Sequence, residues 1–302
     1  MLPRLFEPLK GEKAITTITA KLTSNASYIE AVKKYECGLK KPSHDLSVGK
    51  KSEFFLQAYR RITGEVLSKE EVIVDFGCGS GASTGWLAEA GFTVHGVDIL
   101  EYWGKDLPLL GEIGPTLSER VRSHLHVIDP LKNDLPFKDS SIRLIFSDQT
   151  LEHVFDYRSV FAEQARVLKP GGIAIHRFPH GWCLVEPHTK VPMTALTGLS
   201  VYLTIWAMLG RRNQRQIGFN WQDTLTSNRK LLATTNYVSR NSILRAASNL
   251  RLDPSFEDFL DISDRRAGHL YRLAASRGIG GLAKMFLSRF QDNRILVLKK
   301  QI

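Results

Sequence analysis

The sequence predicts an α/β protein built on a doubly wound, mostly parallel sheet, and three observations carry this prediction. Apolar, β-branched runs alternate with helix-length amphipathic segments, which implies parallel pairing of the strands. A glycine-rich turn directly follows the first of these runs. A carboxylate, Asp98, ends the next run, close to the spacing of roughly 20 residues at which nucleotide-binding folds place a ribose-binding acid. This order of strand, glycine turn, helix, strand and acid indicates a site for a nucleoside-bearing cofactor.

The stretch from Val72 to Ile99 organises the chain. Val72, Ile73 and Val74 suit a strand that is buried on both faces. The glycines of the turn would let the backbone approach a ligand where a Cβ would clash. A helix is predicted over residues 82–90 and a second strand over 93–97. The turn also satisfies the dinucleotide pattern G-x-G-x-x-G/A, so an NAD-dependent oxidoreductase is an alternative, although Asp75 would sit poorly beside a pyrophosphate.

Periodicity assigns most of the remaining elements. Helices are expected over 52–62 and 160–168, and strands over 125–128, 142–146 and 173–178. A helix stop, Lys-Pro-Gly-Gly, occupies residues 169–172. We divide the chain into an N-terminal cap or lid at 1–50, a cofactor-binding core at 51–178, a substrate-side insertion at 179–237, and a C-terminal part of the core at 238–302.

Several motifs in order resemble class I S-adenosylmethionine (SAM) methyltransferases. The run Asp75–Gly81 resembles their first motif. Three later motifs resemble motifs of the small-molecule members, the "type 11" kind that includes the quinone-biosynthesis methyltransferases. These motifs are Leu135–Phe137, Leu151–Val154 and Arg166–Gly172. The resemblance covers about residues 70–180 and the end of the chain. It implies a Rossmann-like sheet of seven strands, an antiparallel last strand at 293–300, and SAM as the cofactor.

The resemblance also implies which residues hold the cofactor at the carboxyl ends of the strands. Asp98 is expected to accept the ribose hydroxyls, with Ile99 against the adenine. Asp129 would lie at the edge of the adenine. Residues 130–134, however, make the segment between Asp129 and the Leu-Pro-Phe motif longer than is usual in the family. The expected cofactor-binding residues are Asp75, Gly77, Cys78, Gly79, Gly81, Asp98, Ile99, Asp129, Pro130, Ser147 and Gln149.

A general base is harder to assign, and the candidates are His153, His180, Glu186 and His188. His153 belongs to the Leu-Glu-His-Val motif, where shaping the pocket wall is the alternative role. The other three follow the fifth strand, where a substrate would approach. An imidazole titrates near neutral pH and suits base catalysis. Two histidines and a glutamate can also bind a metal or serve structure, and we predict no metal site.

The distribution of charge and the number of cysteines indicate which binding partners and which cellular compartment to expect. The net charge is +10, and its excess lies in residues 211–302, which hold 17 Lys and Arg against 7 Asp and Glu. This basic third suggests a nucleic-acid methyltransferase as an alternative, but neither an Asn-Pro-Pro-Tyr-like motif nor a Pro-Cys pair follows the fourth strand. We expect a small-molecule or glycan substrate methylated at oxygen, with a non-catalytic SAM-binding protein as a further alternative. Three widely spaced cysteines and no secretory signal favour the cytoplasm.

The segment from Val191 to Gly210 carries no charged residue and is followed by Arg211, Arg212 and Arg215. Its length reaches the roughly 20 residues needed to cross a bilayer, but Pro192, Gly198 and several hydroxyl residues lower its apolarity. We interpret it as a buried cap helix. The alternatives are a helix on an anionic membrane surface and a bilayer span. The side chains that decide between them are Leu199, Leu203, Ile205 and Trp206.

Overall fold

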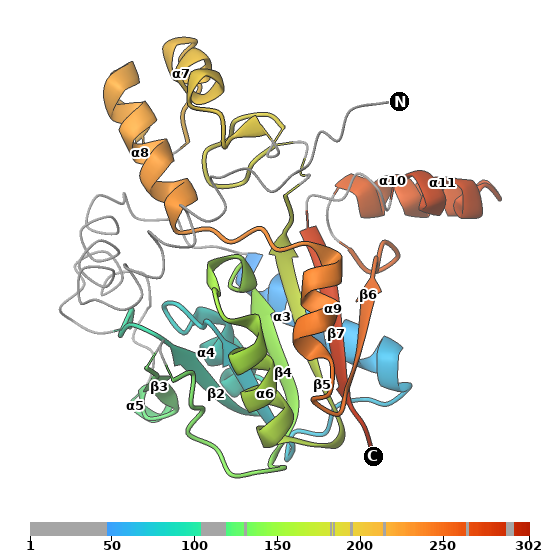
Figure 1. The fold of residues 1–302 in the computed structure, drawn as a ribbon. Helices are drawn as coiled ribbons and strands as arrows, with labels where there is room; N and C mark the ends of the chain where they lie inside the picture. Colours follow the sequence, from blue (N-terminus) through green and yellow to red (C-terminus); the bar gives the residue numbers. More distant parts are fainter. Residues whose placement is uncertain are drawn as a thin grey trace.

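A seven-stranded sheet forms the centre of the computed structural model (Figure 1). The described residues are 47–103, 119–129, 132–181, 183, 185–193, 196–213, 216–263, 266–287 and 293–302. The strand order is β3-β2-β1-β4-β5-β7-β6. The strands are β1 (Val72–Phe76), β2 (Thr93–Asp98), β3 (Leu125–Val127), β4 (Ile142–Asp148), β5 (Leu168–Pro179), β6 (Leu252–Glu257) and β7 (Asn293–Lys300).

The pairing of the strands confirms the predicted fold class. Strands β3, β2, β1, β4 and β5 pair in parallel, and β7 runs antiparallel to both β5 and β6. The chain therefore has a Rossmann-like, doubly wound sheet with an antiparallel last strand, as the sequence predicts. In such a sheet the carboxyl ends of the parallel strands meet at one edge, and ligands bind in the crevice beyond it.

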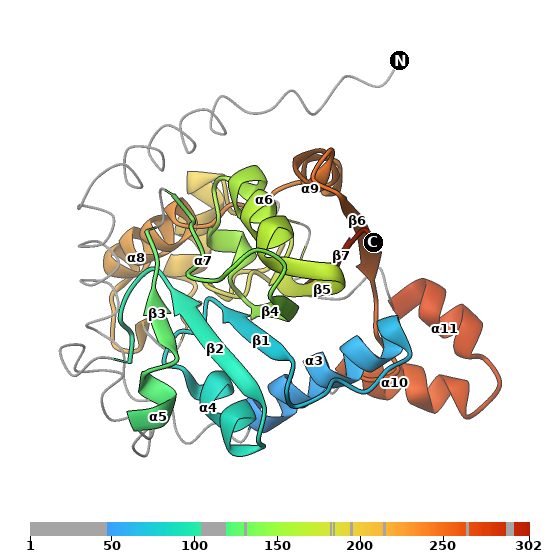
Figure 2. The same cartoon turned by 90° about the horizontal axis from the view of Figure 1, so that it is seen from below.

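Helices cover both faces of this sheet, as Figure 2 shows. On one face lie α3 (Ser47–Thr63) and α4 (Ala82–Glu89), and on the other lie α6 (Tyr157–Val167) and α9 (Arg240–Ala247). Successive side chains of β1 pack against opposite helical layers, because side chains alternate between the two faces of a strand. Ile73 packs with Phe55 of α3, and Val74 packs in the cluster that contains Phe161 of α6. Both strand residues are fully buried, which explains why the strand begins with three apolar residues in a row, Val72–Val74.

Some boundaries differ from the sequence prediction for identifiable reasons. Helix α3 begins at Ser47, so it crosses the expected boundary at residue 50, and the rest of the expected cap, residues 1–46, lies outside the described residues. Leu168 has extended dihedrals, so the Lys-Pro-Gly-Gly run belongs to β5 and not to a separate turn. The sequence analysis does not anticipate strand β6. This strand contains Pro254 and lies at an edge of the sheet, where a proline is tolerated.

The insertion after β5 forms a separate helical layer, at the top of Figure 1. It contains α7 (Ser200–Met208) and α8 (Trp221–Ala233). Leu203 and Ala207 of α7 pack against Leu225 of α8 and Val191. The charge-free run is therefore not one continuous helix, because α7 begins only at Ser200. None of the helices in the described part of the chain is both long and apolar enough to cross a bilayer.

Three shorter connections complete the described chain. The one-turn helix α5 (Glu119–Arg122) precedes β3, and the 3-10 turn η1 (Leu151–His153) follows β4. Between β6 and β7 the chain forms a pair of helices, α10 (Arg266–Ala275) and α11 (Gly280–Leu287), which lies beside the sheet in both views. The sequence analysis assigns residues 238–302 to the core without anticipating this excursion.

Candidate functional site

The glycine turn after β1 packs closely on one side and faces open space on the other. Gly77, Gly79 and Gly81 all have positive φ angles, of 78°, 53° and 75°, a conformation that favours glycine. A Cβ on Gly77 would approach the side chain of Thr150 to 2.3 Å, whereas a Cβ on Gly79 would meet no atom of the described part of the chain within 4 Å. The backbone at Gly79 is therefore exposed to a space in which a ligand can approach the main chain.

Asp98 ties this turn to the end of β2. Its Oδ2 accepts a hydrogen bond from the amide of Gly79 at 2.8 Å, and its Oδ1 accepts one from the amide of Ile99 at 2.7 Å. The amides of Gly77 and Cys78 both donate to the carbonyl of Val97. The carboxylate of Asp98 thus fixes the amides of Gly79 and Ile99, one on the turn after β1 and one directly after β2.

Asp75, in β1 just before the turn, is buried, and its Oδ2 accepts from the hydroxyl of Thr84 at 3.0 Å. Burial raises the pKa of Asp75 to about 7. The hydrogen bond from Thr84 opposes this shift, and the negative charges of Asp98 and Asp148 add to it. Burial also raises the pKa of the Cys78 thiol well above its usual value. A cation near these carboxylates would be stabilised electrostatically.

The other expected cofactor residues lie in different environments. Asp129 is exposed at the end of β3, Ile99 is half-buried beside Asp98, and Pro130 lies outside the described residues. Gln149, half-buried after β4, has a positive φ of 59° and donates to Oδ1 of Asn293 at 3.3 Å. Ser147 is fully buried, and its hydroxyl lies 2.8 Å from Nδ1 of His176, which is also fully buried. The hydroxyl of Ser147 is therefore part of the protein interior.

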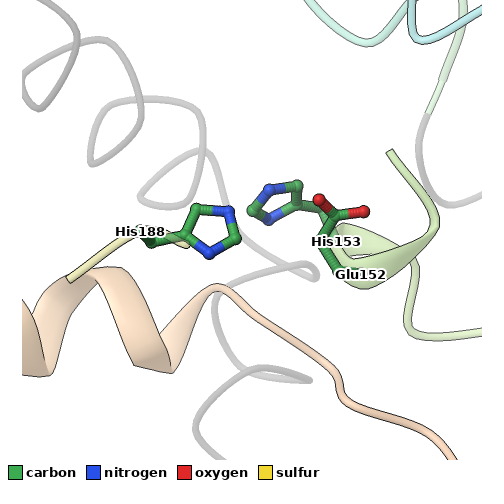
Figure 3. Close-up of side chains that lie close together, drawn as sticks. All are labelled: Glu152, His153 and His188. Carbon is green, nitrogen blue, oxygen red and sulfur yellow. The ribbon is translucent and has the colours of Figure 1, made fainter. Parts of the chain in front are cut away.

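The side chains of Glu152, His153 and His188 lie close together (Figure 3), and the first two belong to the segment that follows the carboxyl end of β4. Glu152 and His153 belong to η1, which begins directly after Thr150, the residue that packs on Gly77. The ligand atoms of the three residues all lie within 4.8 Å of one another. The Leu-Glu-His motif and the loop after β5 are therefore brought together, close to a contact with the glycine turn.

Glu152 is the least expected member of this group. Its side chain is fully buried, and neither carboxylate oxygen has a hydrogen-bond partner among the described residues. Burial raises the pKa of Glu152 to about 8; its own amide opposes the shift, and the carboxylates of Asp148 and Glu186 add to it. An unsatisfied buried carboxyl group destabilises a fold unless something compensates it.

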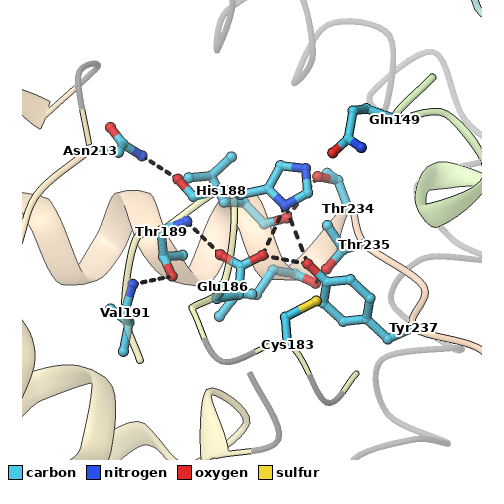
Figure 4. Close-up of polar contacts among 12 residues, drawn as sticks. Gln149, Cys183, Glu186, His188, Thr189, Val191, Asn213, Thr234, Thr235 and Tyr237 are labelled. Atoms are coloured by element: carbon cyan, nitrogen blue, oxygen red, sulfur yellow. Dashed lines mark hydrogen bonds and ion pairs between the residues drawn. The ribbon is translucent and has the colours of Figure 1, made fainter. Parts of the chain in front are cut away.

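The carboxylate of Glu186 contacts one ring nitrogen of His188 and so orients the imidazole (Figure 4). Nδ1 of His188 lies 2.9 Å from Oε1 of Glu186, a residue that is fully buried. Oε1 also accepts from the hydroxyl of Tyr237, and Oε2 accepts from the amide of Thr189. Burial acts to raise the pKa of Glu186, but the hydrogen bonds and the charge of His188 lower it to about 2. Glu186, predicted as a catalytic candidate, is thus fully buried and contacts Nδ1 of His188 directly.

Residues 234–237, which follow α8, form hydrogen bonds that connect the segments carrying this group of side chains. The carbonyl of Thr234 lies 2.8 Å from Nδ1 of His153, and the amide of Asn236 donates to the carbonyl of Glu152 at 2.5 Å. The side-chain amide of Asn236 donates to the carbonyl of Val154 at 2.8 Å. Residues 234–237 therefore bind along η1 and bring Tyr237 to Glu186.

The last predicted candidate, His180, is half-buried just after β5. Its backbone contacts Sγ of Cys183, since the thiol lies 2.9 Å from the carbonyl of His180 and 3.4 Å from its amide. His180 does not belong to the cluster formed by Glu152, His153 and His188.

Sequence reasoning missed Glu152, Thr234 and Tyr237. Glu152 stands inside a motif used for the resemblance, and a carboxylate shortly after an apolar strand is a signal for it. Thr234 and Tyr237 carry no local signal, because their partners lie 81 and 51 residues away in sequence.

Comparison with known proteins agrees with this geometry. Residues 74–176 match the family model of the methyltransferase domain "Methyltransf_11". A demethylmenaquinone methyltransferase of Tropheryma whipplei is 34% identical over 123 residues, covering 40% of this chain and 47% of that protein. The methyltransferase GfsG of Streptomyces halstedii is 29% identical over 122 residues, covering 38% and 42%. The chain thus spans about half the length of the curated relatives it matches.

Among solved structures, geranyl diphosphate C-methyltransferase from Streptomyces coelicolor A3(2), in complex with Mg²⁺, geranyl diphosphate and S-adenosyl-L-homocysteine, is 18% identical, with a TM-score of 0.46 and coverage of 83% of this chain and 78% of that chain. The matched domain extends from β1 into β5 and so contains the glycine turn, Asp98 and η1. The motifs, the sheet topology and the family match lead to one conclusion: this chain contains a class I SAM-dependent methyltransferase domain.

Proposed function

We propose that the chain transfers a methyl group from SAM to a small molecule, at an oxygen atom. The observation that carries the proposal is the open space over Gly79, directly beside the carboxylate of Asp98. A glycine backbone without a Cβ, next to an acid at the end of the second strand, matches the site of a nucleoside with two ribose hydroxyls.

The residues present fit this cofactor. Asp98 would accept the ribose hydroxyls, Ile99 would cover the adenine, and the turn from Gly77 to Gly81 would hold the amino acid portion. Asp75, whose pKa is raised to about 7, favours a cation nearby because a positive charge stabilises its ionised form. SAM supplies a methyl group on a cationic sulfur, and the protein has to hold both reactants in line.

The acceptor is expected beside His153 and His188. Both imidazoles are half-buried at the edge of the sheet where the glycine turn lies, and both have one ring nitrogen occupied by an oxygen acceptor. A carbonyl only accepts hydrogen bonds, so Nδ1 of His153 carries the hydrogen and Nε2 carries the lone pair. These two histidines are the groups best placed to manage the proton of a hydroxyl acceptor.

Ligand binding by calorimetry tests the cofactor half of the proposal. S-adenosylhomocysteine should bind with one site per chain and raise the melting temperature, because a ligand of the native state stabilises it. NAD and NADP should do neither, and stabilisation by NAD in place of S-adenosylhomocysteine would contradict the proposal. Methyl transfer from labelled SAM to a panel of phenols, catechols, quinols, sugars and nucleic acids tests the acceptor class. Transfer to nucleic acid alone would exclude a small-molecule substrate.

A peripheral contact with an anionic membrane is a second part of the proposal. Helix α7 buries one stripe, Leu203 and Ala207, and exposes the opposite one, Val201, Ile205 and Met208, with exposed fractions of 73%, 49% and 64%. Trp206 and Tyr202 are partly buried against α8. This finding corrects the expectation of a buried cap helix, since Leu199 and Ile205 are half exposed and the buried stripe packs on α8, not on the sheet.

The surroundings of α7 suit a lipid headgroup layer. Exposed basic side chains lie at its ends, where Nε of Arg211 donates to the carbonyl of Lys190 and Arg229 contacts the hydroxyl of Ser200. Apolar side chains in the acyl boundary and about 1 kcal/mol for each basic residue near anionic lipid would act together. A lipid-carried substrate would then reach the insertion from the membrane plane.

A further inference from the structure

We infer that Glu152, His153 and His188 form a binding site for one divalent transition-metal ion, of the class of Zn²⁺, Mn²⁺ or Fe²⁺. Each residue offers one ligand atom, and these atoms lie within 4.8 Å of one another (Figure 3). Two imidazoles and one carboxylate are a donor set for such ions, whereas Mg²⁺ and Ca²⁺ prefer oxygen ligands throughout. This site was not expected from the sequence, which predicts no metal site.

The buried carboxylate is the first independent observation. Glu152 has no exposed surface, and its two oxygens have no hydrogen-bond partner among the described residues. A neutral glutamic acid would not resolve this, because its O–H would still be a buried donor without an acceptor. A cation at the centre of the cluster would satisfy the carboxylate directly, and the buried acid would then be explained as a ligand.

The outer partners of both histidines are the second observation. Nδ1 of His188 lies 2.9 Å from Glu186, and Nδ1 of His153 lies 2.8 Å from the carbonyl of Thr234. Metal-binding histidines are commonly held in this way, by a carboxylate or a backbone carbonyl on the nitrogen that does not bind the metal. Both contacts fix the tautomer that presents the lone pair on Nε2. Tyr237 and the amide of Thr189 hold Glu186 in turn.

The geometry requires only a small closure. Ligands about 2.1 Å from a tetrahedral ion are about 3.4 Å apart. Atoms within 4.8 Å of one another would thus draw together by at most about 1.4 Å. The three residues come from two segments, η1 and the loop after β5, which are joined through residues 234–237. Three protein ligands leave a fourth position open, which is typical of a site that binds a substrate or water.

The open position gives the ion a role that rests on the proposed function. An acceptor hydroxyl bound there would lose its proton more readily, because a cation stabilises the oxyanion. Its oxygen would then form a bond to the methyl carbon while the carbon–sulfur bond breaks. The electron pair of that bond stays on sulfur, giving S-adenosylhomocysteine, and the hydroxyl proton leaves to solvent. With the ion bound, the two histidines would act on the proton of the hydroxyl indirectly, by holding the ion, in place of the direct proton transfer considered under the proposed function.

Metal binding to the tag-free protein tests the site without any substrate. Co²⁺ and Zn²⁺ are the probes: Co²⁺ titration followed by visible absorption reports the ligand geometry, and competition with Zn²⁺ reports affinity. We expect one equivalent per chain. Glu152→Gln and His188→Gln should each weaken Co²⁺ binding at least 100-fold, and Tyr237→Phe should weaken it about 10-fold by loosening Glu186.

The matched control is His126→Gln. His126 belongs to another histidine group, on β2 and β3, where it lies 3.1 Å from Nδ1 of His95. This substitution should leave Co²⁺ binding unchanged. Circular dichroism of each variant checks that the fold persists, and His188→Gln, on a loop, remains informative if Glu152→Gln does not fold.

The outcomes separate this inference from the proposed function. Absence of stoichiometric binding, or equal binding by wild type, Glu152→Gln and His188→Gln, would overturn the metal site. Loss of binding in His126→Gln alone would move the site to β2 and β3 and overturn it as well. Calorimetry with S-adenosylhomocysteine reports on the cofactor site alone. Cofactor binding without metal binding leaves the methyltransferase proposal standing, and the reverse result leaves the metal site standing.

Discussion

The amide of Gly79 donates a hydrogen bond of 2.8 Å to Oδ2 of Asp98, which joins the turn after β1 to the end of β2. The two residues are 19 positions apart, and each lies at the end of one of two neighbouring parallel strands. One supplies a bare backbone and the other an acid, so the two halves of a nucleoside site are fixed relative to each other. The glycine turn and the acid can therefore each be tested by a separate substitution.

Gly79→Val should abolish binding of S-adenosylhomocysteine in a protein that still folds. The branched side chain would enter a space that holds no atom of the described residues within 4 Å of the Cβ position, where we propose that the ligand approaches. Gly64→Val is the matched control, because Gly64 also has a positive φ and an empty Cβ position, at the end of α3. Both variants bear a similar backbone strain of about 1–3 kcal/mol. Calorimetry that finds wild-type affinity for Gly79→Val would contradict the assigned ligand position.

Asp98→Ala should weaken binding of S-adenosylhomocysteine by about 1–3 kcal/mol, since the ribose hydroxyls would lose a charged acceptor. The corresponding increase in Kd is roughly 5- to 150-fold. Glu101→Ala is the control: Glu101 is an exposed acid shortly after Asp98 in the chain. If the two variants bind equally well, the ribose assignment is wrong.

Asp75→Asn should change how stability depends on pH. The pKa of Asp75 is 3.8 without its environment and about 7 in the folded protein. The folded state holds the extra proton between these values, so this residue makes the free energy of unfolding fall as pH rises from about 4 to 7. The loss is of order 4 kcal/mol at most. Urea denaturation should show a flatter profile for Asp75→Asn than for wild type, and Glu101→Gln should retain the wild-type slope. Parallel profiles for wild type and Asp75→Asn would remove the assigned shift.

Val201→Glu together with Ile205→Glu should abolish co-sedimentation with anionic vesicles at low salt, because charges would replace the exposed stripe of α7. Val66→Glu is the control, since Val66 is 76% exposed at a site remote in sequence from α7. All variants should keep the wild-type melting temperature. Failure of the wild-type protein to bind vesicles of phosphatidylglycerol and phosphatidylcholine would end the membrane proposal.

The parallel core could be predicted from the sequence because its signals are local. The strand at Val72, the glycines and Asp98 lie within one short stretch of the chain, and each position is dictated by a backbone requirement or by burial. The bounds predicted for β7, Asn293–Lys300, are also those observed. Its neighbour β6 escaped prediction, because Pro254 and alternating exposure at an edge hide the pattern that marks a buried strand.

The rest of the site depends on contacts that have no local signature. Nothing near Tyr237 in the sequence indicates that it bonds to Glu186, and Thr234 contributes only a carbonyl. The charge-free run misled in a different way. Its composition predicted one buried helix, but Pro192 and Gly198 precede α7, which forms only from Ser200 and buries only one stripe. Average apolarity does not reveal which side of a short helix has a partner.

The attachment of residues 234–237 to η1 has a consequence for chimeras of this chain. The insertion after β5 resembles an exchangeable module, and an engineer would place the joints at its helices. A joint placed before Thr234 keeps the carbonyl that holds His153 and the hydroxyl that holds Glu186. A joint placed after Tyr237 removes that hydroxyl and leaves a foreign backbone to supply the carbonyl at position 234. Transplanted acceptor preferences should therefore survive only when the downstream joint respects this short segment, whatever helices the donor supplies.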